Sequence, residues 1–120
     1  MDIKEFAEQN NIAIIAKACV NDTCFEILKR DLELESYDLF NQLILYGTVD
    51  GLKENVEGQI MPRIWVQGNT KCVICMPKDK ILVALFFDND MNARDNFFHA
   101  EHLDELLRDV FAENADRSSG

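Results

Sequence analysis

The apolar positions near the N-terminus change from a helical to a strand-like spacing. Residues Asp2–Gln9 place apolar side chains on one side and charges on the other, which predicts a short helix that ends at Asn10-Asn11. The runs Ile12–Val20 and Thr23–Lys29 follow, rich in β-branched and small residues and separated by Asn21-Asp22. Because Asn-Asp is a credible two-residue turn, this part of the chain predicts a β-hairpin.

The middle of the chain carries the longest helical pattern. Apolar residues recur with a period of about 3.6 from Tyr37 to Val56, and Ser36 stands at the expected N-cap position. Further apolar residues, Leu45 among them, widen the apolar face beyond one stripe. A helix that is apolar over so much of its circumference packs on both sides, which we expect to be its own sheet and a second subunit.

Three strand-like runs separated by turn residues occupy the second half of the chain. They are Arg63–Gln67, Lys71–Met76 and Lys80–Phe87. Their short connections require antiparallel hairpins. The apolar residues from Ile81 to Phe87 are continuous rather than alternating, which is typical of a strand covered on both faces.

A final amphipathic helix is expected after the polar link Asp88–Asn96, with Asn96 as its N-cap. The element order is then α-β-β-α-β-β-β-α, which predicts an α+β fold with one five-stranded antiparallel sheet packed against helices. We expect a single domain over residues 1–113 and a small, polar, disordered tail over residues 114–120. The predicted apolar side of the last helix carries Phe97, Phe98, Leu103, Leu106, Leu107, Val110 and Phe111.

Composition and charge narrow the function mainly by exclusion. The chain has 120 residues, 48% of them apolar, and this fits one domain with its own core. Its formal net charge is -10, which argues against nucleic acid and against anionic membrane surfaces as partners. The apolar runs are too short to insert into a membrane, and the charged N-terminus does not resemble a signal peptide. A cytoplasmic location is therefore expected.

The cysteines Cys19, Cys24, Cys72 and Cys75 invite a zinc interpretation. However, Cys72 and Cys75 lie in a strand-like run, where residues three apart point to opposite faces of the sheet. The intervening Val73-Ile74 does not supply the tight turn of a zinc knuckle. Because disulfides are also rare in the cytosol, we expect free and mostly buried thiols.

Other candidate sites fail on spacing. His99 and His102 flank Glu101 but do not form H-E-x-x-H, so we interpret them as part of a solvated helix face. Asp88–Asn92 begins like a calcium loop, but Ala93 stands where the loop needs glycine. No phosphate-binding glycine motif and no recognisable nucleophile motif occurs in the sequence. We therefore expect no catalytic residues, no metal and no cofactor, and classify the chain as a non-enzyme.

The central and C-terminal segments resemble those of a known family. The resemblance lies in the helix Tyr37–Tyr46, the Arg-Ile-Trp-Val strand, the segment Cys72–Asp79, the turn Pro77–Lys80 and the strand that ends in Phe87-Asp88-Asn89. On these residues the chain is similar to the roadblock family, whose dynein light chains and bacterial relatives share a profilin-like sandwich. The first hairpin lacks the glycine-containing turn usual in that family, and the extra C-terminal helix is more similar to bacterial and archaeal members.

The resemblance implies a non-catalytic homodimer. In that family the central helix and the third strand join two copies, the two sheets become one, and the joined surface docks another protein, often a small Ras-like GTPase or a motor or scaffold subunit. The alternation around Trp65 agrees, since tryptophan is enriched at interface centres; an alternative places Trp65 under a helix of its own chain. The implied interface residues are Tyr37, Phe40, Asn41, Ile44, Thr48, Arg63, Trp65 and Gln67.

Two other functions stay open at this point. The first is an acidic secretion-type chaperone dimer that binds an effector segment. Such chaperones usually place three strands before the central helix and two after it, and the segment Leu32-Glu33-Leu34 decides that count here. The second is a small-molecule sensor, which requires a hollow core lined by polar groups. The continuous apolar strand Ile81–Phe87 gives little sign of one.

Overall fold

A computed structural model describes the backbone of residues 1–119 and the side chains of residues 1–112. The predicted tail over residues 114–120 lies outside the fully described residues and stays a prediction. In the part of the chain that is described, no helix is long and apolar enough to cross a membrane. The elements are α1 (Ile3–Gln9), β1 (Ile14–Cys19), β2 (Glu26–Lys29), α2 (Asp38–Phe40), the π-helix η1 (Asn41–Leu45), α3 (Val49–Val56), β3 (Arg63–Gln67), β4 (Thr70–Lys78), β5 (Ile81–Asp88) and α4 (Ala93–Ser119).

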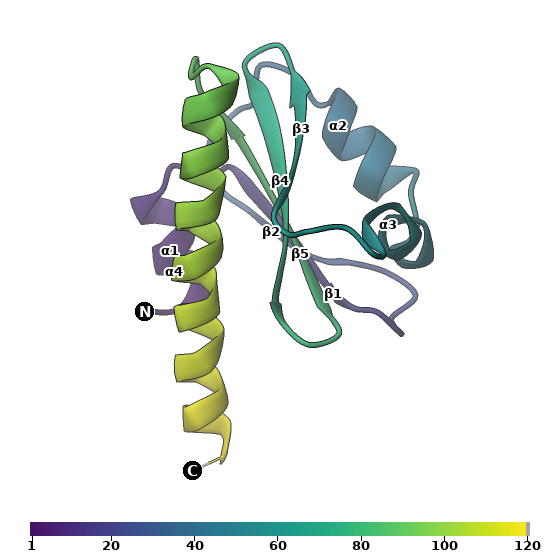
Figure 1. The fold of residues 1–120 in the computed structure, drawn as a ribbon, viewed down its shortest axis with the longest axis vertical. Coiled ribbons are helices and arrows are strands. Elements are labelled where there is room, and N and C mark those ends of the chain that lie inside the picture. Colours follow the sequence, from purple (N-terminus) through teal and green to yellow (C-terminus); the bar gives the residue numbers. More distant parts are fainter. Residues whose placement is uncertain (120) are drawn as a thin grey trace.

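The strands form one antiparallel, five-stranded sheet in the order β2-β1-β5-β4-β3. β5 therefore lies at the centre, and β2 and β3 form the two edges. Helices α1 and α4 cover one face, while α2, η1 and α3 cover the other (Figure 1). The predicted α+β architecture, a single antiparallel sheet packed with helices, is confirmed.

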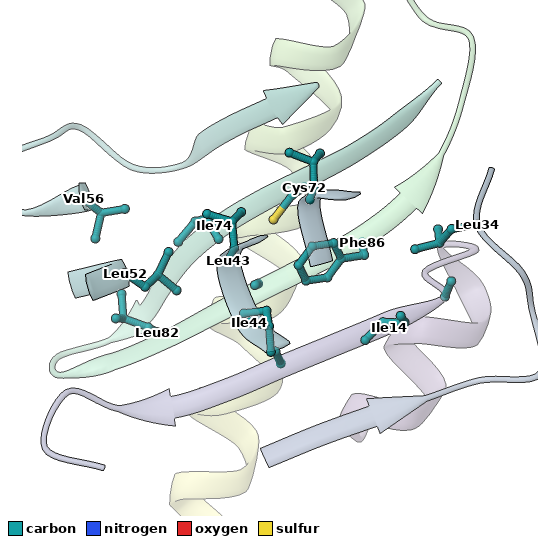
Figure 2. Packing of buried hydrophobic residues seen from close by; sticks show 14 residues of the cluster. Ile14, Leu34, Leu43, Ile44, Leu52, Val56, Cys72, Ile74, Leu82 and Phe86 are labelled. Atoms are coloured by element: carbon teal, nitrogen blue, oxygen red, sulfur yellow. The ribbon is translucent and has the colours of Figure 1, made fainter. Parts of the chain in front are cut away.

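The two faces of β5 build two separate cores, as its continuous apolar sequence predicts. Leu82 and Phe86 pack beneath α2, η1 and α3, and Figure 2 shows this cluster from close by. Val83 and Leu85 pack on the opposite side, beneath α1 and α4. All four side chains are fully buried. Alternate residues of one strand thus hold both helical layers to the sheet.

The short N-terminal helix follows the prediction. Asp2 is the N-cap of α1, and its Oδ1 accepts a hydrogen bond from the Glu5 N–H at 2.8 Å. Phe6 is fully buried against α4, so this helix adds to the core. The helix ends at Asn10, whose Nδ2 donates to the Phe6 carbonyl oxygen at 2.9 Å. Asn11 follows with a φ of 55°, a left-handed conformation that asparagine tolerates.

The connection between β1 and β2 is longer than the predicted two-residue turn. The pair nearest the loop is Lys17 with Glu26, so the connection runs over residues 18–25. Within it, the Asp22 N–H donates to the Cys19 carbonyl oxygen, and Asp22 Oδ2 accepts from the Cys19 N–H, both at 2.9 Å. Asn21-Asp22 therefore forms a turn inside the loop rather than the tip of a hairpin, because β1 continues to Cys19 as the partner of β5.

The single central helix that the pattern predicts is broken into α2, η1 and α3. The break follows from Gly47, which lies so close to η1 that a Cβ there would be 2.3 Å from the Leu43 carbonyl oxygen. Thr48 then starts a new helix, since its Oγ1 accepts from the Gly51 N–H at 2.9 Å. As a consequence Tyr46, predicted on the apolar face, is 82% exposed.

The last helix starts earlier than predicted and turns a different side toward the sheet. Asn92 Oδ1 accepts from the Asp95 N–H at 2.8 Å, so Asn92 caps the helix and Asn96 lies within it. Asn96 is buried on the inner side. Because the next two positions then point away from the sheet, the predicted burial of Phe97 and Phe98 is wrong, and both are about half exposed. The buried residues of the predicted apolar side are Leu103, Leu107 and Val110.

Candidate protein-interaction surface

β3 forms one edge of the sheet, and within residues 1–119 no strand lies on its outer side. Gly68, at a φ of 62°, permits a two-residue turn that makes Gln67 and Thr70 the pair closing the β3–β4 hairpin. Hydrogen-bonded and non-bonded pairs alternate along an antiparallel ladder. Counting back from that pair, Ile64 and Val66 direct their backbone N–H and C=O groups outward. These groups are available to another strand.

The two edges of the sheet differ in how they receive a partner. β2 is short and has Glu26 at one end and Lys29 at the other, and charged side chains on an edge oppose strand addition. β3 also begins with a charged residue, Arg63, but it carries three apolar residues in succession, Ile64–Val66, where β2 carries two. Val66 is 58% exposed. β3 is therefore the edge whose sequence favours pairing.

Trp65 lies on the side of the sheet that α2 covers. It pairs with Cys72, whose side chain belongs to the core beneath α2. The indole is half-buried and packs on that core together with Tyr37 and Phe40. The Arg63 guanidinium carbon lies 5.8 Å from the centre of its ring. Trp65 thus rests on its own chain while part of its ring stays at the surface.

The segment between β2 and α2 holds α2 in place near this edge. The Glu35 N–H donates to Asp88 Oδ2 at 2.8 Å, and the Ser36 N–H donates to Thr70 Oγ1 at 3.1 Å. The Thr70 hydroxyl donates to Asp88 Oδ1 at 2.5 Å. Because Thr70 begins β4 and Asp88 ends β5, the chain that enters α2 is tied to the end of both strands. The predicted N-cap position of Ser36 is wrong by one residue, because the observed N-cap is Tyr37. Ser36 Oγ still accepts a hydrogen bond from the Asp38 N–H at 3.2 Å.

The residues that the resemblance implies for a dimer interface are not all at the surface. Ile44 is only 5% exposed and belongs to the core, so it supports the helix from within. Thr48 is exposed, but its hydroxyl caps α3. Tyr37, Phe40, Asn41 and Trp65 are half-buried, and Arg63 and Gln67 are exposed.

Sequence reasoning missed the exposed apolar residues around β3. Ile60, which precedes the strand, is 90% exposed. It belongs to no periodic pattern, and its place just before a predicted strand is the signal that marks it. Phe97 was assigned to the wrong side of its helix. The polar residue Asn96 in the same turn was interpreted as a cap, which hid the correct helical phase.

The two cysteines of β4 lie on opposite faces of the sheet. Cys72 and Cys75 lie in different cores, as their spacing predicts. Burial raises the pKa of both thiols, and the Asp104 carboxylate raises that of Cys75 further. Cys19 and Cys24 are exposed because they lie at the ends of the long β1–β2 loop, so the prediction of mostly buried thiols holds for only two of the four. Where side chains are described, no group of three His, Cys, Asp or Glu residues is placed to hold a metal.

The two histidines of α4 differ in environment. The His99 ring packs edge-on against Phe87, with ring centres 5.4 Å apart. Burial lowers the pKa of His99, and the neighbouring His102 lowers it further. His102 is exposed. The predicted solvated helix face therefore holds for His102, while His99 is a partly buried packing residue.

Comparisons with known proteins give a limited result. No protein-family model matches the chain. No curated protein shows significant sequence similarity to it. Among solved structures it is similar to Myxococcus xanthus MglB, with a TM-score of 0.49 and 10% sequence identity, over 91% of this chain and 90% of that chain. A likeness at this level of identity and TM-score shows neither the family nor the function of the chain.

Proposed function

We propose that this chain is a non-catalytic homodimeric interaction module of the roadblock type, which acts as a regulator or scaffold for a small Ras-like GTPase or for a motor or complex subunit. The observation that carries the proposal is the unpaired apolar edge β3, on which Trp65 stays partly at the surface. An edge of this kind attracts another strand. Pairing with a second copy about a two-fold axis gives the outward backbone groups of β3 hydrogen-bond partners. It also leaves neither β3 edge free, so that the assembly stops at a dimer.

The two-fold symmetry restricts how two β3 edges pair. The outward backbone groups belong to Ile64 and Val66, and an antiparallel register that uses all of them places Ile64 of one copy opposite Val66 of the other. Trp65 then lies on the axis and faces its own counterpart, with Cα atoms about 4.5 Å apart. In this register four backbone hydrogen bonds form, each contributing about 0.5–1.5 kcal/mol.

The order of the elements supports this function over the secretion-chaperone alternative. Two strands precede the central helical region and three follow it. The segment Leu32-Glu33-Leu34 forms no strand, and Leu34 instead packs into the core beneath α2. The arrangement is the reverse of the one usual in those chaperones. A hollow sensor core is equally disfavoured, because both faces of β5 are filled by apolar side chains.

The test of the dimer is the solution mass by light scattering. We expect wild type to have about twice the chain mass of 13.8 kDa. Val66→Pro removes an outward donor and leaves the hydrogen bonds to β4 in place, so it should give a folded monomer. Val66→Thr is the matched control and should stay dimeric. A monomeric wild type, or a Val66→Pro dimer, would contradict the proposal.

The GTPase part of the proposal needs a separate experiment. Purified small Ras-like GTPases of the source organism, loaded with GDP or with a non-hydrolysable GTP analogue, are titrated with the wild-type chain and with Val66→Pro. We expect binding of at least one GTPase that depends on its nucleotide and is weakened when the dimer is split. If no GTPase binds in either nucleotide state, the GTPase part of the proposal is contradicted and the homodimer part is unaffected.

A further inference from the structure

A groove of about 510 Å³ lies beside β3 on the face opposite Trp65. Its lining residues are Ile64 of β3, Ile60 and the residues that follow it, and Phe97 and Glu101 of α4. On this side of the sheet α4 packs mainly on β4 and to a lesser extent on the edge strand β3. The volume of the groove falls in the range of binding pockets, about 300–1,000 Å³.

The walls of the groove present apolar side chains to solvent. Ile60 is almost fully exposed and Phe97 about half exposed, and Ile64 is only half-buried. Clustered exposed apolar residues of this kind mark interaction sites.

The charge of the groove is set by Glu101. Arg63 also lines the groove, but its Nη1 donates to Gln59 Oε1 at 3.1 Å and its guanidinium lies over the Trp65 ring on the other face. The ion pairs among the described residues involve other carboxylates and leave Glu101 without a cation. Glu105, one helical turn further along α4, is also exposed. The groove is therefore apolar with a free negative charge at its wall.

We propose that this groove binds a short segment of a partner protein in which apolar side chains flank a lysine or arginine. The apolar side chains pack on Ile60, Ile64 and Phe97, and the cation pairs with Glu101. A strongly acidic chain, with a formal net charge of -10, attracts such a segment from a distance. The inference rests on the proposed role as an interaction module. It does not depend on the β3 homodimer, because every lining residue belongs to one chain.

Three fluorescein-labelled ten-residue peptides test this chemistry by fluorescence anisotropy: one of alternating Leu and Lys, one of alternating Leu and Glu, and one of alternating Ser and Lys. We expect the Leu/Lys peptide to bind wild type about tenfold more tightly than either of the others. Phe97→Ser and Glu101→Lys should each weaken it about tenfold. Glu101→Lys should also bind the Leu/Glu peptide better than wild type does. Glu8→Lys, an equal charge change on exposed α1, is the matched control and should bind like wild type.

Distinct outcomes overturn the inference. Equal weakening by Glu8→Lys and Glu101→Lys would show general attraction to an acidic surface and no site. If the Phe97→Ser variant binds the Leu/Lys peptide as tightly as wild type does, Phe97 is not part of the binding site and the inference is contradicted. If Phe97→Ser splits a wild-type dimer, a second copy covers the groove and the proposed occupant is wrong. A monomeric wild type that follows the expected peptide pattern supports the groove and contradicts only the homodimer.

Discussion

Gly47 ends the helical segment that carries Tyr37 and Phe40, and its substitution tests why the central helix is broken. A Cβ at Gly47 would lie 2.3 Å from the Leu43 carbonyl oxygen and 2.8 Å from its carbonyl carbon. Side-chain carbons do not approach such atoms within 3.0 Å, so the gap must widen by at least about 0.7 Å. Both clashing atoms belong to the backbone, and no change of rotamer relieves them. Leu43 and Ile44 are buried and would move with the backbone.

Overpacking of this kind costs about 1–3 kcal/mol. Because the displaced turn carries two core residues, we expect Gly47→Ala to lower the free energy of unfolding by about 2–3 kcal/mol. Gly51→Ala is the matched control within α3. Its nearest contact is Thr48 Oγ1 at 3.0 Å, and the gain in helix propensity is about 1 kcal/mol.

The measurement is urea denaturation followed by circular dichroism, at one protein concentration because the stability of a dimer depends on it. We expect Gly51→Ala to stay within about 1 kcal/mol of wild type. A Gly47→Ala protein as stable as wild type would refute the steric explanation. Equal losses in both variants would also refute it, since glycine itself and not the close approach would then matter.

Three further predictions concern titratable groups. Cys72 and Cys75 should resist iodoacetamide at neutral pH while the two loop cysteines react, because burial raises the pKa of the inner thiols; modification of all four in the folded chain would contradict this. The pKa of His99 is lowered by burial and by a neighbouring histidine, so the unfolded chain binds the proton more readily, and stability should fall as the pH drops below 6.5. His99→Phe should reduce the difference in the free energy of unfolding between pH 7 and pH 5.5, measured by denaturation at each pH. A difference equal to that of wild type would contradict the prediction. Arg108→Ala should lower the free energy of unfolding by about 1–3 kcal/mol, because it leaves the buried Asp104 carboxylate without its cation. In the wild type Arg108 Nη2 lies 3.1 Å from Asp104 Oδ2. Adding Asp104→Asn should recover most of that loss, and a neutral Arg108→Ala would refute the coupling.

Much of the fold was predictable because the sheet is built from strong local patterns. The continuous apolar run of β5 indicated two covered faces, and the structure places alternate residues in two cores. The predicted bounds of β3 agree with the structure, and β4 begins one residue earlier and ends two residues later than the predicted run Lys71–Met76. These signals depend on neighbouring residues only, so the sequence carries them in full.

The errors arose where a contact that the pattern of apolar residues does not reveal decides the conformation. β1 continues beyond β2 because β5 pairs with it, so the loop is longer than Asn21-Asp22 suggested. Gly47 ends the helix because its backbone lies very close to the Leu43 carbonyl group. The spacing of apolar residues along the sequence gives no information about this distance. Asn96 lies on the inner side of α4, where a polar residue was not expected.

The candidate surface was predictable only in part. The edge position of β3 depends on the strand order, which places it beside β4 alone and leaves its outer side free. The resemblance pointed to Trp65, which lies on that edge strand and is half-buried. It also implied Ile44, which is buried in the core. Ile60 was missed because its exposure follows from the path of the chain after α3.

The most direct test of the β3 homodimer is a cross-link at its proposed axis. Trp65→Cys, in a chain whose exposed Cys19 and Cys24 are replaced by serine, brings two thiols together across the two-fold axis at a Cα separation that suits a disulfide. Gln67→Cys in the same background is the control, because residue 67 faces residue 63 of the second copy in this register. Under mild oxidation we predict a covalent dimer for Trp65→Cys on a non-reducing gel and little for Gln67→Cys. No cross-link at position 65, or equal cross-linking at both positions, would contradict the pairing of two β3 edges.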